Sequence, residues 1–412
     1  MKPVYIVSWL FALAISFVSC DDWLDKTPKD RLYPDVYFKT EDELRLFTNQ
    51  FYNNLVPSAV DIYSESSDLI VKSDLMLEMS GQRIIPDEGN GWNFTALRDI
   101  NFYLQYSHNC TEVNARNRYD GVARFFRAYF YFEKVKRYGD IPWYDKALDS
   151  DDPELYKARD SREFVMQKML EDLDFAIANL PKTKNAYVLT RWTALALKSR
   201  VCLFEGTFRK YHGLEDCEKY LNACVSASET FMNESGYTLY KSGSTPYRDL
   251  FASINLQADE VIFGRDYEAS LSVLHNVQNY ENSTTMGRPG MNKKIVNSYL
   301  MADGSRFTDK AGYETMTFDQ ECQNRDPRRA QTIRTPGYTR IGSTKKEAPN
   351  LAYTMTGYHL IKYSMTANYD EYNKSCNDIP LFRTAEVYLN FAEAKAELGT
   401  LKQADINKSI KL

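Results

Sequence analysis

Histidine is scarce in this sequence: His108, His212, His275 and His359 are the only four in 412 residues. No two of them stand at the spacing of a helical zinc-binding pair, which excludes an HExxH site and a histidine-rich metal cluster. The same scarcity disfavours a Ser–His or Cys–His catalytic pair, although it leaves one open. The composition therefore points away from the commonest metal and nucleophile sites.

The sequence also lacks an excess of positive charge and a second long apolar run. Its 51 basic and 56 acidic residues give a formal net charge of −5, which provides no electrostatic footprint for nucleic acid. Beyond the N-terminus, no apolar stretch approaches the ~20 residues that a transmembrane helix needs. We therefore expect a globular body that does not bind nucleic acid.

Cysteine is sparse, and its spacing carries no recognisable motif. Besides Cys20, six cysteines are scattered along the chain, and none forms a CxxC pair. An exported protein could oxidise an even number of thiols, but we favour mostly free, buried thiols over a disulfide framework. Cys217 and Cys224 stand on one face of a predicted helix, where they suit small core positions.

Aromatic residues are abundant by contrast. The chain contains 30 Tyr, 22 Phe and 5 Trp, which together make up 14% of it. Hydrophobic residues at 43% and charged residues at 26% are ordinary for a folded protein and argue against disorder. The composition describes a large, acidic, tyrosine-rich globular protein.

The N-terminus resembles that of an exported lipoprotein. Lys2 precedes an almost wholly apolar run from Val4 to Val18, which is too short for a membrane span and typical of a signal peptide. Ser19 and Cys20 resemble a bacterial lipobox, and the acidic residues after them resemble the surface-export tag of some Gram-negative outer-membrane lipoproteins. We expect residues 1–19 to be removed and Cys20 to be acylated, with more than one acyl chain giving a stable anchor. The alternative is a secreted protein with a free cysteine near its start.

Five helices are predicted from a 3.6-residue periodicity and from capping signals. They span residues 120–138, 160–180, 190–206, 215–232 and 380–398. Gly139, Pro181, Gly206 and Gly399 are the expected terminators, and the second helix is predicted to start with a capping box from Asp160 to Glu163. Aromatic residues on all sides of the 125–132 segment indicate a buried helix.

Helices of this length in antiparallel pairs favour a mainly α fold: a tetratricopeptide-like helical solenoid (α-α superhelix) with little β structure. No clean self-match with a period of about 34 residues appears, so an irregular helical domain stays open. Three long stretches, residues 57–92, 237–297 and 303–377, show little periodicity. Structureless loops of this length are usually functional, so we expect them to be irregular ligand-binding loops.

Eight segments, in the same order along the chain, resemble motifs of the SusD/RagB family of outer-membrane nutrient-binding lipoproteins. They are Cys20–Pro28, Trp92–Asn101, Gly121–Phe132, Arg137–Pro142, Thr190–Arg200, Met301–Phe307, Asp326–Arg328 and Pro380–Ala394. In the third segment Val122 replaces the family's usual Glu. The resemblance divides the chain into a signal peptide (1–19), an N-terminal SusD-like helical region (20–235) and a C-terminal RagB/SusD region (236–412). Because family members continue well beyond Asp405–Asn407, we expect a truncation at the C-terminal end.

The resemblance implies a surface-exposed lipoprotein of the outer membrane that binds an oligosaccharide or polysaccharide. It would deliver this glycan to a SusC-like TonB-dependent transporter and would catalyse no reaction. The same fold and partner could instead serve peptides, as in RagB-like members. Two further hypotheses stay open, namely a surface glycoside hydrolase and a scaffold that binds no ligand.

Two of the irregular stretches supply candidate ligand-binding residues. The apolar face of a sugar ring stacks on Trp or Tyr, while its hydroxyl rim pairs with planar groups such as those of Asn, Asp and Arg. Side chains of both kinds occur together in the candidates Arg83, Asp87, Asn90, Trp92, Asn93, Tyr280 and Asn282. The alternative for Trp92 is that it anchors the following helix to the core, and for Tyr280 that it is an ordinary loop tyrosine.

No catalytic residue, metal or cofactor is predicted. A glycosidase needs two carboxylates ~5–9.5 Å apart across a sugar, and among 56 acidic residues no sequence pair stands out. The segment Asp303–Gly304–Ser305 superficially resembles a calcium loop, but the ligand spacing of an EF-hand is absent.

Overall fold

The computed structural model describes residues 37–59, 62, 68–86, 89 and 91–411. The predicted signal peptide and Cys20 lie outside these residues. The described chain forms a mainly α fold with two small antiparallel sheets of two strands each. Among the described residues, no helix is long and apolar enough to cross a membrane.

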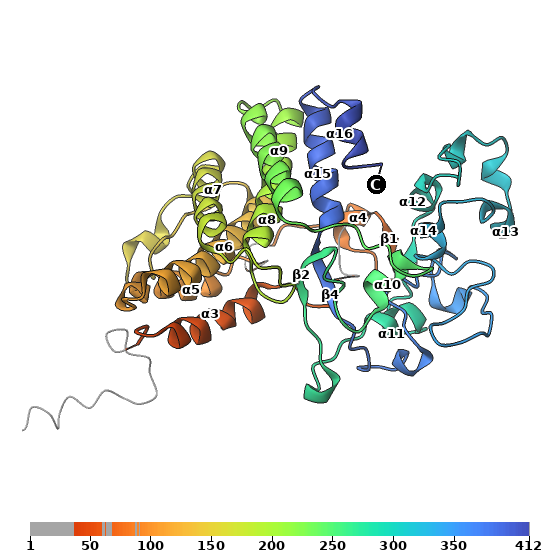
Figure 1. The fold of residues 1–412 in the computed structure, drawn as a ribbon, viewed down its shortest axis with the longest axis horizontal. Coiled ribbons are helices and arrows are strands. Elements are labelled where there is room, and N and C mark those ends of the chain that lie inside the picture. Colours follow the sequence, from red (N-terminus) through yellow and green to blue (C-terminus); the bar gives the residue numbers. More distant parts are fainter. Residues whose placement is uncertain (1–36, 60–61, 63–67, 87–88, 90, 412) are drawn as a thin grey trace, which may run out of the picture.

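The helical part of the molecule consists of long helices that pack side by side in chain order (Figure 1). It contains α3 (Glu41–Leu55), α5 (Thr95–Tyr106), α6 (Val113–Tyr138), α7 (Arg162–Asn179), α8 (Arg191–Tyr211), α9 (Cys217–Glu234), α15 (Thr384–Glu397) and α16 (Gln403–Asn407). Each of α6, α7 and α8 contacts the helix that follows it, and α15 returns from far along the chain to pack on α8 and α9. This arrangement confirms the predicted tetratricopeptide-like solenoid.

The loop-rich part, residues 237–383, lies on the other side of the molecule (Figure 1). The prediction of long structureless stretches was wrong in detail, because short elements occur throughout them. These are α10 (Pro246–Ala252), α11 (Val277–Asn282), α12 (Lys293–Ser298), α13 (Phe318–Glu321) and α14 (Pro327–Ala330), together with β2 (Val261–Arg265), β3 (Gly290–Met291) and β4 (Ile379–Arg383). The earlier stretch contains β1 (Ile70–Val71), which pairs with β3, and α4 (Leu77–Ser80).

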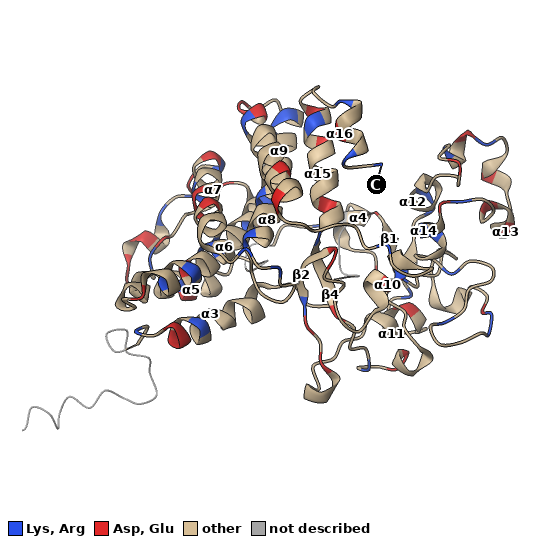
Figure 2. Ribbon diagram, in the orientation of Figure 1, with Lys and Arg blue, Asp and Glu red and all other residues tan. Residues whose placement is uncertain are grey.

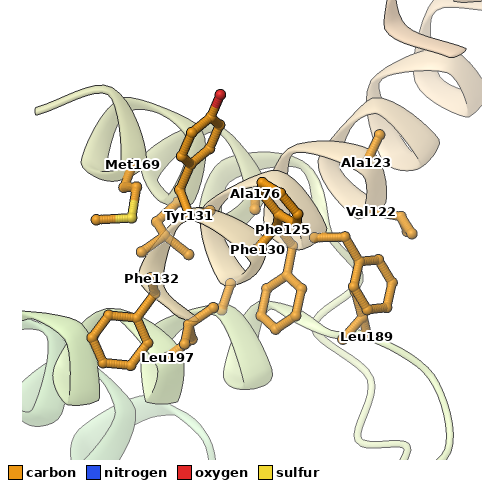
Figure 3. Packing of buried hydrophobic residues seen from close by; sticks show 14 of the residues in the cluster. Val122, Ala123, Phe125, Phe130, Tyr131, Phe132, Met169, Ala176, Leu189 and Leu197 are labelled. Carbon is orange, nitrogen blue, oxygen red and sulfur yellow. The ribbon is translucent and has the colours of Figure 1, made fainter. Parts of the chain in front are cut away.

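Helix α6 forms the centre of the larger hydrophobic core. Phe125, Phe126, Phe130, Tyr131 and Phe132 are all at most 5% exposed, and Figure 3 shows the last three leaving the helix in different directions. A helix that is apolar on several sides must be covered on all of them, and α3, α5 and α7 each pack against it. The prediction of a buried helix from its aromatic run is confirmed.

Helices α6 and α7 begin at residues other than those predicted. Helix α6 starts at Val113 rather than near residue 120, and Ala115 in the added turns is buried. Helix α7 is capped by Ser161, whose hydroxyl accepts a hydrogen bond from the Phe164 amide, so the predicted capping box at Asp160 was wrong. Asp160 instead accepts a hydrogen bond from the Trp143 amide at 2.7 Å and ties down the preceding loop.

Gly206 does not end α8, which continues to Tyr211. A Cβ atom at this position would lie 2.7 Å from Cγ of Leu221 in α9, closer than two carbon atoms can approach. The glycine therefore permits close packing of two helices and is not a terminator. The prediction took a tertiary contact for a local stop signal.

The predicted fifth helix is in fact a strand followed by a helix. Ile379–Arg383 forms β4, which pairs antiparallel with β2, and α15 begins only at Thr384. Pro380 faces Gly264 in the pair, and a Cβ atom on Gly264 would lie only 2.6 Å from the carbonyl oxygen of Ile379. Pairing with a distant strand thus decided the conformation of this segment.

All six described cysteines are free thiols. Cys110, Cys202, Cys224 and Cys376 are buried, whereas Cys217 and Cys322 are half-buried. Acidic and basic residues are interspersed along the helices and loops, as Figure 2 shows.

Candidate functional site

A pocket of about 610 Å³ opens beside Trp92. One wall comes from the segment that enters α5 and from the first turns of that helix, and the other comes from residues 142–159, the loop between α6 and α7. Aromatic side chains in the lining are those of Trp92, Phe94 and Tyr144, and basic ones are those of Arg98, Lys146, Lys157 and Arg159.

Trp92 is both packed and accessible. Its ring meets Tyr138 edge to face at a centroid distance of 4.9 Å and Phe94 at 5.3 Å, yet the residue is 39% exposed. Its backbone is set by a turn, in which the Trp92 amide donates to the Gly89 carbonyl and Gly91 has a φ of 85°. The indole is therefore held by two aromatic neighbours while part of its surface remains open.

A buried polar network fixes the wall formed by the loop. The side-chain amide of Asn101 in α5 donates to the carbonyl oxygens of Tyr144 and Lys146 at 2.8 and 3.2 Å. Arg127 of α6 donates to Asn101 at 3.2 Å and makes a bidentate pair with Asp172 of α7 at 2.7 and 2.8 Å. Three helices thus hold the loop in place before any ligand arrives.

A second set of contacts from α6 adds to this rigidity. The Tyr131 hydroxyl accepts from the Tyr144 amide at 2.6 Å and donates to the Pro142 carbonyl at 3.2 Å. The ring of Tyr131 stacks on Trp143 with centroids 4.3 Å apart. Burial raises the pKa of Tyr144, whose hydroxyl donates to the Glu154 carbonyl at 3.1 Å. A preorganised wall lowers the entropic cost of binding a ligand against it.

The predicted candidate residues of the first stretch do not all reach this pocket. Trp92 lines it, whereas Arg83 lies exposed between α4 and α5. Asp87 and Asn90 lie outside the described residues. The side-chain oxygen of Asn93 accepts from the amide of Thr95, the first residue of α5, at 2.8 Å.

Asn93 lines a neighbouring pocket of about 500 Å³ instead. Thr95 contributes to both pockets, and the second one also contains Asp99, Tyr129 and Glu133. Burial raises the pKa of Asp99 above its usual range. Two hollows therefore adjoin each other at the start of α5.

The other two predicted residues lie in α11 of the loop-rich part, away from α5 (Figure 1). Asn282 is buried, and its side-chain oxygen accepts from Arg334 at 3.2 Å and Arg340 at 3.3 Å, while its amide donates to Ser364. Tyr280 is half-buried against the second hydrophobic cluster. The structure therefore does not bring the two predicted groups of residues into one site.

Sequence reasoning missed most of the pocket wall. Tyr144, Lys146, Lys157 and Arg159 stand in a stretch without periodicity between two helices. The one available signal was the aromatic pair Trp143–Tyr144 directly after a helix stop, since large aromatic side chains in a connecting segment need either a core or a ligand. Among the described residues, no group of three or more His, Cys, Asp or Glu side chains could hold a metal ion.

Two family models match separate regions of the chain, one in the loop-rich part and its C-terminal helices and one in the helical part. Residues 250–412 match the model of the SusD family, and residues 81–191, which include the pocket, match a family described as "Starch-binding associating with outer membrane". The SusD-like protein P2 of Formosa agariphila is 26% identical over 94% of this chain and 76% of its own length. The SusD-like protein P38 of the same organism is 25% identical over 50% of this chain and 43% of its own length.

Two solved structures share the fold. A SusD-like protein of Bacteroides fragilis superposes with a TM-score of 0.73 at 22% identity, covering 94% of this chain and 80% of the other. A SusD-like carbohydrate-binding protein of the same species superposes with a TM-score of 0.72 at 18% identity, covering 91% and 78% of the two chains. At these identities the superpositions establish the architecture.

Proposed function

The chain belongs to the SusD/RagB family, and from this premise we propose that it binds a glycan in the pocket beside Trp92. The observation that supports this most strongly is an indole that is 39% exposed at the mouth of a rigid, partly aromatic pocket. A partly exposed aromatic ring in a preformed hollow suits the apolar face of a sugar ring, and the surrounding polar groups suit its hydroxyls. The proposal also keeps four neighbours of Trp92 on the same segment, namely Arg83, Asp87, Asn90 and Asn93. Tyr280 and Asn282 stay a separate candidate group.

Tryptophan fluorescence offers a direct test. Of the three tryptophans that the structure describes, Trp143 and Trp192 are only 6% and 3% exposed, so we expect a ligand-induced quenching or shift of the emission to be lost in Trp92→Ala. We expect a glycan panel to contain a ligand whose binding heat in calorimetry is lost in Trp92→Ala. Tyr372→Ala is the matched control, because this tyrosine is 68% exposed in the loop-rich part. Equal loss of binding in both variants would contradict the proposed site.

We propose that the protein acts as a binder and catalyses no hydrolysis. No carboxylate side chain is among the described residues that line the pocket, and a glycosidase needs two. Incubation with the bound polysaccharide and a reducing-end assay checks this, since sustained product release cannot come from a binder.

Delivery to a SusC-like TonB-dependent transporter and anchoring of the protein through Cys20 complete the proposal. Cell fractionation of Cys20→Ala should move the protein out of the outer-membrane fraction, and co-purification from membranes should recover a TonB-dependent transporter. Peptide transport with the same partner is the second candidate. Calorimetry that gives a signal with a peptide pool and none with any glycan would favour it.

A further inference from the structure

The charged side chains in the pocket lining all have one sign. Arg98, Lys146, Lys157 and Arg159 line it, and no carboxylate does so among the described lining residues. A pocket for a neutral sugar would be expected to mix acceptors with donors, because each hydroxyl both donates and accepts. Cationic side chains can only donate, so the lining favours a ligand that accepts.

The two lysines are already paired with carboxylates of the same loop. Lys146 lies 2.9 Å from Glu154 and 3.4 Å from Asp152, and the hydrogen bond to Glu154 raises the pKa of Lys146. Lys157 lies 2.9 Å from Asp160 and donates to the Trp143 carbonyl at 2.7 Å. These lysines help to hold the loop, and their charge is largely compensated.

The two arginines are less engaged. Arg98 donates to the Leu148 carbonyl at 3.2 Å and is 4.0 Å from Asp149, with both side chains mostly exposed. The guanidinium of Arg159 lies over the Trp92 ring, 5.0 Å from its centroid, and no carboxylate of the described residues forms an ion pair with it. Such exposed contacts are weak and exchange easily for a better partner.

Long-range attraction of an anion is not expected here. The loop also carries Asp145, Asp149, Asp152, Glu154 and Asp160, and both signs of charge occur around it (Figure 2). Selection must therefore act at contact distance, where a guanidinium can bind two oxygens of a carboxylate or of a tetrahedral oxyanion through two parallel hydrogen bonds.

We propose that the pocket selects an anionic sugar, one that carries a carboxylate or a sulfate ester, through Arg98 and Arg159. The sugar ring stacks on Trp92, and Arg159 exchanges its contact with the indole for the anionic group of the ligand. This inference rests on the proposed glycan binding and adds the chemical class of the sugar.

Calorimetry with matched pairs of oligosaccharides tests this proposal. Oligouronates of several backbones are compared with their neutral methyl esters, and sulfated oligosaccharides with their desulfated forms. We expect at least one anionic form to bind tenfold or more tightly than its neutral partner, and the pair that shows the difference identifies the anion. The proposal is overturned if anionic and neutral forms bind equally. It is also overturned if a neutral glycan binds in a Trp92-dependent way and no anionic ligand is found. Either result leaves glycan binding intact. Absence of any binding would defeat the proposed function as well.

Variants of the two arginines separate specificity from structure. Arg98→Gln and Arg159→Gln should each weaken binding of the anionic form at least fivefold and leave binding of its neutral partner within twofold. Arg45→Gln is the control, because Arg45 is an exposed arginine of α3 paired with Asp42 and should change neither. Equal losses for both forms in the pocket variants would contradict a role in selecting charge.

Discussion

The helical part and the loop-rich part are stabilised in different ways. The helical part is centred on a continuous apolar core around α6, with a few buried ion pairs such as Arg127–Asp172 beside it. The loop-rich part has a smaller apolar cluster and, beside it, buried charged side chains that bond to one another and to backbone groups. Long helices satisfy their own backbone groups and need only apolar faces to pack. Irregular chain cannot do so, and buried polar side chains replace the missing pattern of backbone bonds.

Two clusters show this clearly. Arg329, 1% exposed, pairs with Glu321 at 2.9 Å, and the other oxygen of Glu321 accepts from the Tyr358 hydroxyl at 3.2 Å. Arg340 pairs with Glu347 at 3.2 Å and with Asp370 at 2.7 Å. Such networks are satisfied only as a whole, so the loop-rich part should tolerate substitution less well than the helical part.

The largest difference is expected between a substitution that removes a buried charge and one that keeps a buried side chain apolar. Arg329→Met leaves Glu321 buried without its cation, and breaking a buried pair in this way costs about 3–5 kcal/mol. Phe126→Leu in the helical core keeps an apolar side chain and should cost about 1–1.5 kcal/mol. Urea unfolding of both variants measures the two losses. Arg328→Met is the control, since Arg328 is mostly exposed, and an equal loss there would contradict the argument.

Acidification should affect the loop-rich part first. Burial lowers the pKa of His275 to about 4 and that of His359 to about 3. In the neutral form each ring uses both nitrogens. Nε2 of His275 lies 2.9 Å from the Asn377 carbonyl, and its Nδ1 accepts from the Val277 amide. Nε2 of His359 lies 2.7 Å from the Glu281 carbonyl, and its Nδ1 accepts from the Asn350 amide. The unfolded chain binds protons below its pKa near 6.5, so stability falls as the pH drops from 6.5 towards 4.

This effect amounts to roughly 2 kcal/mol for each of the two histidines at pH 5. Hydrogen exchange at pH 7 and pH 5, corrected for intrinsic rates, should show lost protection in residues 275–282 and 350–364 while α6 and α7 keep theirs. Simultaneous loss in both parts would show that the molecule unfolds as one unit and would remove this distinction.

A smaller effect is expected where α8 and α9 pack most closely. Gly206→Ala places a Cβ atom 2.7 Å from Leu221, and such overpacking costs about 1–3 kcal/mol, partly offset by the better helix propensity of Ala. Leu221→Ala leaves a cavity when introduced alone. The double variant should be more stable than the sum of the two single losses predicts, as thermal unfolding can show. Strict additivity would mean that the two positions do not meet.

The smallest loss of stability is expected at the pocket. Trp92 is 39% exposed, so Trp92→Ala should lower the free energy of unfolding by about 1 kcal/mol, well below the cost of emptying a core position. Its effect on glycan binding should nevertheless be complete. A loss of stability as large as that of Arg329→Met would show that Trp92 mainly anchors α5.

Local signals in the sequence were sufficient to predict much of the helical part. Thr190 caps α8, Gly139 follows α6, and Pro181 closes off α7. Each acts through its own backbone or its nearest neighbours, so its effect can be predicted from the sequence alone. The predictions at Gly206 and Pro380 were wrong because the role of each depends on a neighbour that it meets only in the folded chain. This neighbour is Leu221 for Gly206 and β2 for Pro380.

The candidate site shows the same limit. The stacking potential of Trp92 could be predicted from residue type and position, and that residue does line a pocket. The opposite wall could not be predicted, because it is placed by contacts between distant parts of the chain. Asn101 and Tyr131 bind the backbone of Tyr144, and Lys157 donates to the Trp143 carbonyl. Asn282 was selected for its polarity, and the structure uses that polarity to bind Arg334 and Arg340.

The most direct test of glycan binding by the helical part is hydrogen exchange with and without a glycan that binds in calorimetry. We expect added protection in residues 91–101 and 142–159, the two walls of the pocket, and none in residues 246–298. Protection confined to α11 and its neighbours in the loop-rich part would contradict the proposed site.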